Sequence, residues 1–183
     1  MKKAGLAGAL LFASTLQFFI VIFIAQSMIP GYSIYDSFIS ELGVGETAAL
    51  FNTSLIILSS ALILSALLLY SISTTKRFAL LIAAIGVCGI GVALFPLDNQ
   101  PLHAIISGTA FILSILAVMS TYEMLPKPFN LTSILIALVS SVALLLLITN
   151  NFFGLGQGGI ERVFIYLNLI FTALFGLYLI KKT

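Results

Sequence analysis

Six long apolar runs divide this chain, and they restrict its fold more than any other feature. The runs cover residues 5–28, 48–72, 78–95, 102–122, 131–149 and 160–180. Each approaches or exceeds the roughly 20 residues that a helix needs to cross a bilayer core of about 30 Å. Unsatisfied backbone groups are costly in lipid, so a spanning segment is either a helix or part of a closed barrel. The runs are rich in Leu, Ile and Ala without strict alternation, which favours helices over a barrel.

The composition agrees with a membrane protein. Charged residues make up 8% of the chain and hydrophobic residues 61%, whereas a soluble domain has about 25% charged residues. A water-soluble fold is therefore excluded, and nothing supports nucleic-acid binding. The 183 residues leave no room for a separate soluble domain. We therefore predict an all-α, polytopic membrane protein with one six-span domain over residues 1–183.

The charges between the runs are segregated by sign. Five of the six acidic residues occupy one set of connections, together with the single histidine and one arginine. The other seven basic residues occupy the alternate set. The first set is Asp36, Glu41, Glu46, Asp98, Glu161, His103 and Arg162, and the second is Lys2, Lys3, Lys76, Arg77, Lys127, Lys181 and Lys182. Basic residues concentrate on the cytoplasmic side of membrane proteins. We therefore expect a multi-pass plasma-membrane protein with cytoplasmic termini and outer connections near 29–47, 97–101 and 150–159. The first run is too long for a signal peptide and is expected to be retained.

The first outer connection carries helix signals. Ser33 and Asp36 have the spacing of a capping box, with Asp in place of Glu, and Gly43 is a suitable stop. The sequence predicts a short helix between them, lying in the interface plane as a lid over the bundle.

Asp98 and His103 flank the turn between the third and fourth runs, and Ser107 follows one helical turn later. A carboxylate, an imidazole and a hydroxyl suit a general acid–base pair, a nucleophile set or two metal ligands. Alternatively, Asp98 caps the fourth span and His103 lies at headgroup level. Asp98, His103 and Glu41 are the candidate ligands for a divalent metal. No nucleotide or redox cofactor motif is present, and the single cysteine, Cys88, cannot form a disulfide within the chain.

A glycine-rich segment over residues 154–159 precedes Glu161 and Arg162. Glycines before a helix start allow a close backbone approach, and the free N–H groups there favour an anion. Arg162 suits bidentate contact with a phosphate or carboxylate. The alternative is a flexible turn with an Arg162 salt bridge to Asp36, Glu41 or Asp98. Glycines 86, 89 and 91 indicate close helix packing.

Three segments together resemble a known family. They are the stretch 35–43 followed by Phe51 and Asn52, the stretch 89–98 followed by His103, and the Glu161–Arg162 pair. The chain resembles the small six-span prokaryotic proteins grouped as Domain of Unknown Function nine-nine-eight, which more often carry Asp where Glu41 stands. More loosely, it is similar to the Frag1/DRAM/Sfk1 group, which is tied to lipid remodelling. The resemblance implies that the outer polar residues are the functional part and that membrane lipids are the partners.

Two functional hypotheses follow. In the first, the protein binds or modifies a lipid headgroup at the outer face. His103 would then be a base or metal ligand, oriented by Asp98, with Glu41 as second acid. Arg162, Glu161, Asp36, Ser37 and Ser40 would bind the substrate. In the second, the protein is a non-catalytic transporter or assembly factor, and the same charges lock the helix ends together. The oligomeric state is not predicted.

Overall fold

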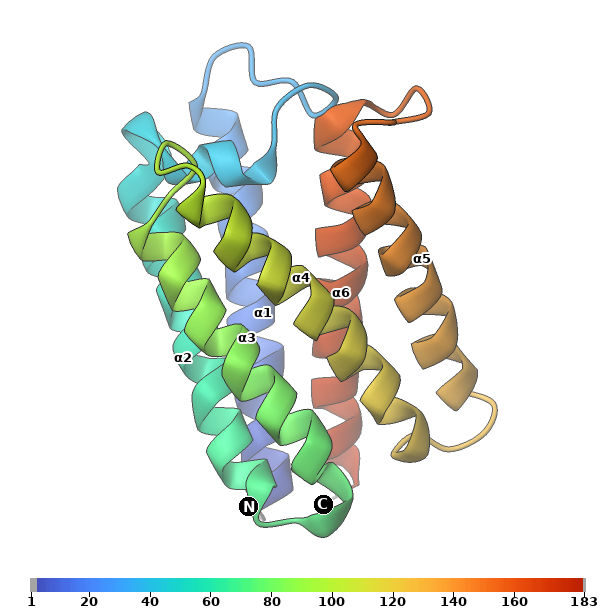
Figure 1. Ribbon diagram of the computed structural model, residues 1–183. Helices are drawn as coiled ribbons and strands as arrows, with labels where there is room; N and C mark the ends of the chain where they lie inside the picture. Colours follow the sequence, from blue (N-terminus) through green and yellow to red (C-terminus); the bar gives the residue numbers. More distant parts are fainter. Residues whose placement is uncertain (1–2, 183) are drawn as a thin grey trace.

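A computed structural model describes residues 3–182 and contains the six expected helices (Figure 1). All six helices in this range are long and apolar enough to span a membrane. They are α1 (Lys3–Met28), α2 (Ala48–Tyr70), α3 (Lys76–Leu94), α4 (Leu102–Ser120), α5 (Asn130–Thr149) and α6 (Gly156–Lys181). Short 3-10 helices lie between them: η1 (Ile39–Gly43), η2 (Gly45–Thr47), η3 (Ser73–Thr75) and η4 (Thr121–Glu123). The predicted all-α, six-span membrane fold is confirmed.

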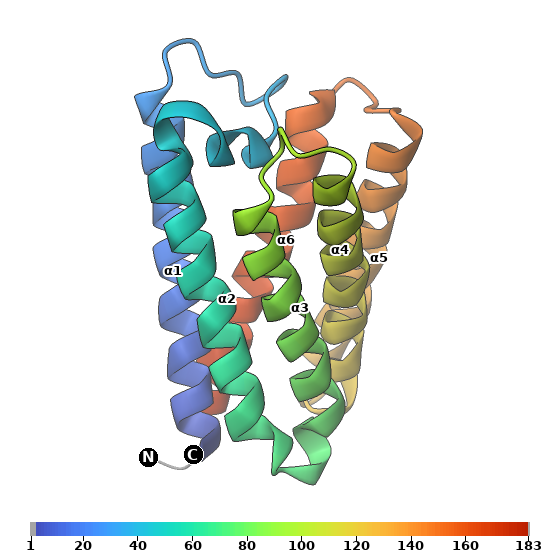
Figure 2. The same ribbon diagram turned by 60° about the vertical axis from the view of Figure 1, so that its left-hand side comes forward.

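The helices form a closed ring. Each packs against the next in the chain, and α6 returns to pack along α1. α4 and α6 touch only sparingly, and α5 packs against both of them (Figures 1 and 2). This arrangement leaves space along the middle of the ring, where the candidate site lies.

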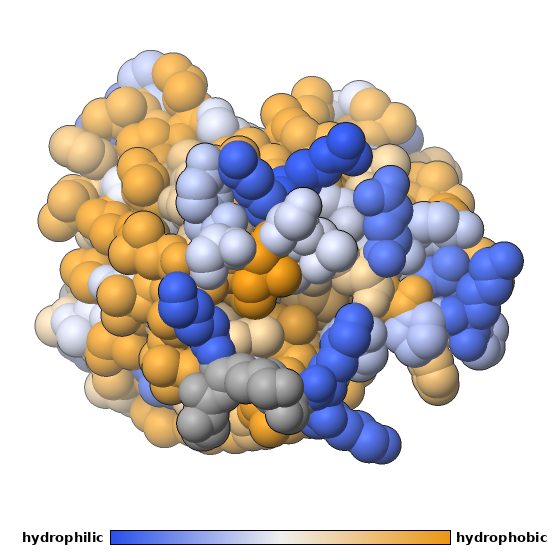
Figure 3. Space-filling view, turned by 90° about the horizontal axis from the view of Figure 1, so that it is seen from below, coloured by the Kyte–Doolittle hydropathy of each residue, from blue (hydrophilic) through white to orange (hydrophobic). Residues whose placement is uncertain are grey.

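Both ends of the chain lie at one end of the bundle (Figure 1). We call this the basic end, because its connections carry Lys76, Arg77, Lys127, Lys181 and Lys182; hydrophilic side chains gather there in Figure 3. Lys2 belongs to the predicted basic set but lies outside the described residues. The opposite, acidic end carries the loop of residues 29–47 and the α3–α4 and α5–α6 connections. Glu123 is an acid at the basic end, and Arg162 is the corresponding exception at the acidic end.

Small residues bring neighbouring helices close together. Gly8 of α1 and Gly176 of α6 face each other so closely that a Cβ on Gly176 would lie 2.7 Å from the Gly8 carbonyl oxygen. A Cβ on Gly86 of α3 would lie 2.7 Å from the Ser59 carbonyl oxygen on α2. Close approach at small residues is the usual basis of helix packing in membranes. The predicted packing role of Gly86 is therefore confirmed.

The 29–47 loop differs from the prediction. In place of one helix between Ser33 and Gly43, residues 34–37 form turns, Phe38 is extended, and η1 follows. The predicted Ser33–Asp36 interaction does form: the Asp36 N–H donates to Ser33 Oγ at 3.0 Å. This hydrogen bond closes only a local turn, however. Side chains of α6 bind the backbone groups that would continue the helix. Ile39 and Leu42 turn into the core, at 1% and 0% exposure.

Candidate functional site

Arg162, in the second turn of α6, binds the 29–47 loop. It is 5% exposed. Nη1 donates to the carbonyl oxygens of Ile34 at 3.0 Å, Ser37 at 2.8 Å and Gly158 at 2.8 Å. Nη2 donates to the Tyr32 hydroxyl at 2.7 Å. The partners of this buried cation are therefore carbonyls and a hydroxyl of its own chain, instead of the carboxylates considered from the sequence.

Tyr32 joins Arg162 to the far side of the loop. Its hydroxyl accepts from Arg162 and donates to the Phe38 carbonyl oxygen at 2.8 Å, and the guanidinium lies 5.4 Å from the centre of its ring. Burial raises the pKa of Tyr32 to about 12, although the neighbouring Arg162 opposes the shift. The hydroxyl therefore stays protonated and able to donate at ordinary pH.

Glu161, the preceding residue, binds a different part of the same loop. It is 4% exposed. One carboxylate oxygen accepts from the Ile39 N–H and the other accepts from the Ser40 hydroxyl at 2.6 Å. Glu161 thus caps the start of η1, whose free N–H groups need an acceptor. Together, Glu161 and Arg162 bind the loop at both ends of the turn between residues 32 and 40.

The glycine-rich start of α6 allows this contact. A Cβ on Gly156 or Gly158 would overlap the carbonyl oxygens of Tyr35 and Ser37 respectively. The Gly158 N–H donates to the Tyr35 carbonyl at 3.0 Å, and the Gln157 side chain donates to the Asp36 carbonyl at 2.6 Å. The close backbone approach predicted for these glycines is therefore made by the chain's own loop. It also explains why α6 begins at Gly156, before the predicted residue 160.

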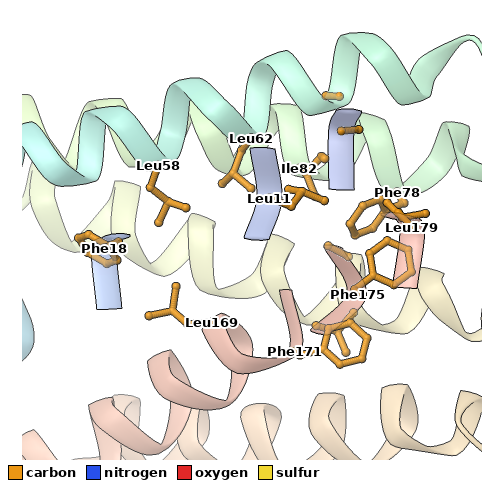
Figure 4. Packing of buried hydrophobic residues seen from close by; sticks show 14 of the residues in the cluster. Leu11, Phe18, Leu58, Leu62, Phe78, Ile82, Leu169, Phe171, Phe175 and Leu179 are labelled. Atoms are coloured by element: carbon orange, nitrogen blue, oxygen red, sulfur yellow. The ribbon is translucent and has the colours of Figure 1, made fainter. Parts of the chain in front are cut away.

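A cavity runs through the ring of helices, beneath this loop. Side chains of α1, α2, α3, α4 and α6 line it, and Ile39 and Ser40 contribute at the acidic end. Its empty space is about 1200 Å³, part of it open to the surroundings. We call it the central cavity; Figure 4 shows Leu58 and Leu62 facing Leu169 across it. Towards the basic end Phe78 and Phe175 meet, with ring centres 4.8 Å apart.

The lining is apolar in the main, and its two ionisable side chains, His103 and Glu161, lie towards the acidic end. Ser40 and Ser107 lie there as well. His103 is 4% exposed, and its Nδ1 lies 2.9 Å from the Phe95 carbonyl oxygen. A carbonyl can only accept, so Nδ1 carries the hydrogen, and in the neutral form of the ring Nε2 is then an acceptor.

Ser40, His103 and Glu161 come from the three segments that suggested a family. The family model described as Protein of unknown function (DUF998) matches residues 12–178. The chain belongs to this family. It matches none of the curated proteins and none of the solved structures with which it was compared. The resemblance to this one family is thereby confirmed, and in this DUF998 chain its segments meet at the acidic end of the bundle.

The structure separates the predicted catalytic residues. Asp98 is exposed, and it lines a shallow groove with Glu41, Val44 and Leu97, apart from the central cavity that His103 lines. The Phe95 carbonyl takes the place on His103 that was predicted for Asp98. Glu41 accepts from the Phe38 N–H at 3.0 Å. Residues 3–182 contain no group of three or more metal-ligating side chains.

The predicted substrate-binding residues are also divided. Ser40 and Glu161 line the central cavity, whereas Arg162 does not. Asp36 is exposed, and its carboxylate accepts from the Ser33 hydroxyl at 2.8 Å. Ser37 contributes its backbone carbonyl to Arg162.

Sequence reasoning missed several cavity residues. Thr15, Ser59, Ser114, Asn168 and Thr172 line the middle of the central cavity. A helical period was the available signal, because residues seven apart share one face. Glu161 and Asn168 are spaced in this way on α6, as are Ser107 and Ser114 on α4.

Proposed function

We propose that this protein binds a single-chain amphiphilic lipid in the central cavity. The head would lie beside His103, Ser40 and Glu161, and the tail would extend among the apolar side chains towards the basic end. The observation that carries the proposal is the cavity itself, which combines a long, mainly apolar lining with its two ionisable side chains, His103 and Glu161, at one end. This is the chemical pattern of an amphiphile. If the basic end is cytoplasmic, as the positive-inside bias indicates, the head lies at the outer leaflet.

The dimensions suit a lipid tail. On α6 the cavity extends from Glu161 to Phe175, and 14 residues of helix rise about 21 Å. Packed protein interiors contain few voids larger than a water molecule. An apolar space of this size inside a membrane protein is therefore expected to be filled by the lipid that surrounds it.

Binding is favoured over turnover by the arrangement around His103. A catalytic imidazole is usually oriented by a third group within reach of nucleophile and base. Here the Phe95 carbonyl orients the ring, while Asp98 and Glu41 lie on a separate groove. The alternative role of the outer charges as a structural lock is compatible with lipid binding, since Arg162 and Glu161 secure the loop that covers the cavity.

The experiment places a large side chain in the cavity by a substitution on α4. Ser114 faces the cavity from α4, and Ser114→Trp would occupy the middle of the tail region. Leu116 lies two residues away on the same helix and is 45% exposed, so Leu116→Trp is the matched control. Purified wild-type protein and both variants are analysed by native mass spectrometry after addition of a labelled single-chain lipid.

We expect the wild type and Leu116→Trp to retain the lipid and Ser114→Trp to lose it. A second filling variant, Ala110→Phe, acts one turn away on the same wall and guards against misfolding of the first. Equal lipid retention by the wild type and both filled variants would contradict the proposal. So would a wild-type protein that takes up no lipid.

A further inference from the structure

Most of the polar atoms that line the acidic end of the central cavity are free to act as hydrogen-bond acceptors and not as donors. In the neutral form of His103, Nε2 is the acceptor, because Nδ1 carries the hydrogen that it donates to the Phe95 carbonyl. The Ser40 hydroxyl donates its hydrogen to Glu161, which leaves the Ser40 oxygen and the carboxylate oxygens as acceptors. Ser107 lies one turn below His103, and its hydroxyl points to the Ala104 carbonyl at 3.4 Å.

The same imbalance continues into the middle of the cavity. The hydroxyls of Ser114 and Thr172 donate to carbonyls one turn earlier in their own helices, at 2.8 and 2.7 Å. Asn168 Nδ2 donates to Ser140 and to the Phe164 carbonyl, while its Oδ1 is buried without a donor among the described residues. The exception is Thr15, 2% exposed, whose hydroxyl has no hydrogen-bond partner within residues 3–182 and can donate as well as accept. A buried polar group without a partner is costly.

Among residues 3–182, no lysine or arginine lines the central cavity to balance an anionic head. Arg162 does not line the cavity, and its two terminal nitrogens donate to Ile34, Ser37, Gly158 and Tyr32. A phosphate in the cavity would face the Glu161 carboxylate and a ring of acceptors. Burial of an unpaired charge costs several kcal/mol, so the lining selects against such a head.

We propose that the ligand of the central cavity is a long-chain alcohol: a single apolar chain whose head is an uncharged hydroxyl. This rests on the proposed function and specifies its ligand class. The hydroxyl donates to His103 Nε2, the acceptor that the Phe95 carbonyl sets in place. The chain lies between α2 and α6 towards Phe78 and Phe175. The earlier prediction of a phosphate or carboxylate held by Arg162 is replaced, because that arginine is already bound by its own loop.

The experiment compares three ligands that share one chain. Tritium-labelled hexadecanol is bound to the full-length protein in lipid nanodiscs. Unlabelled hexadecanol, its methyl ether and hexadecyl phosphate then compete for the site. The ether keeps the chain and the oxygen but lacks the donor. We expect the alcohol to bind about fivefold more tightly than the ether, the value of one neutral hydrogen bond. The phosphate should bind at least about a hundredfold more weakly.

The His103→Leu variant tests whether His103 accepts the hydrogen bond from the ligand hydroxyl. We expect it to lower alcohol affinity about fivefold and to leave ether affinity unchanged, because only the alcohol uses Nε2. Unchanged ether binding shows that the cavity is intact; should the variant fail to fold, the wild-type comparison of alcohol with ether decides by itself.

The outcomes separate the two proposals. Ether or phosphate binding as tight as alcohol binding would overturn the alcohol inference while leaving lipid binding in place. An absence of binding by all three ligands would overturn the proposed function itself.

Discussion

Replacement of Arg162 is the most direct test of how the acidic end is held together. Arg162→Met keeps much of the side chain's length and removes every donor. Four acceptors lose a partner: the carbonyls of Ile34, Ser37 and Gly158 and the Tyr32 hydroxyl.

The expected loss in the free energy of unfolding depends on how many of these four acceptors find new hydrogen-bond donors. Ile34 is exposed, at 60%, so we expect its carbonyl to gain a water once Arg162 is replaced, and Gly158 lies at a position whose carbonyl can bond within α6. Ser37 and Tyr32 are partly buried and remain short of a donor. Hydrogen bonds to charged groups contribute about 1.5–3 kcal/mol each. Two such bonds give about 3–6 kcal/mol, and partial exposure favours the lower value of about 3 kcal/mol. For a chain of this size, that corresponds to a fall in Tm of about 6–12 °C.

The assay combines thermal unfolding in detergent with hydrogen exchange across residues 32–40. We expect a lower Tm and faster exchange in that segment, including the Ile39 amide that Glu161 binds. Arg162→Lys should lie between the wild type and Arg162→Met, because one ammonium group cannot reproduce a planar fork. Arg77→Met removes an exposed arginine at the basic end and is the control. An Arg162→Met protein with the Tm and exchange of Arg77→Met would refute the reasoning.

Three further predictions concern packing, pH and orientation. Gly8→Ala should destabilise the bundle by about 1–3 kcal/mol, because the new Cβ meets Leu179 Cβ at 2.9 Å; Gly108→Ala, with open space around it, should be neutral or stabilising by up to about 1 kcal/mol in the same melts. Because the pKa of Tyr32 is raised from 10 to about 12, its contribution to the free energy of unfolding is fully present below pH 10 and is lost as pH rises towards about 12. Tyr32→Phe should lessen this alkaline loss of stability in unfolding measured across that range. An equal loss in both proteins would contradict the prediction. In a cysteine-free background, a membrane-impermeant maleimide should label Asn151→Cys and spare Lys127→Cys in intact cells, and the reverse pattern would invert the proposed orientation.

The helices could be predicted because a membrane span is a property of local composition. Hydropathy alone placed the start of α4 at residue 102 and that of α2 at residue 48. The same local logic failed in the 29–47 loop. Ser33 and Asp36 do form the expected turn, yet the helix does not continue, because Glu161 takes the Ile39 N–H and Arg162 takes the Ser37 carbonyl. Those partners are more than 120 residues away in the chain, and no local pattern could indicate them.

The Asp98–His103 prediction failed for a related reason. Five residues across a turn allow the two side chains to meet, but they do not require it. A backbone carbonyl competes for the imidazole, and every residue has one. The Phe95 carbonyl lies at the end of α3, where helix carbonyls lack partners, so it is well placed to accept from His103 at 2.9 Å. Side-chain identities in a sequence do not show this competition.

Arg162 illustrates how far the charge pattern alone can lead. Its position among acidic residues made it a candidate for binding a substrate anion, because a lone cation at an acidic face is conspicuous. The charge pattern located the correct end of the bundle. It could not decide between an external anion and the chain's own carbonyls, since both satisfy a guanidinium. The glycines at 156 and 158 decide it, because they let the loop backbone approach α6 closely enough for Arg162 to reach the carbonyls of Ile34 and Ser37. The residue beside it, Glu161, lines the central cavity instead, so one turn of helix both anchors the loop and contributes to the polar end of the site.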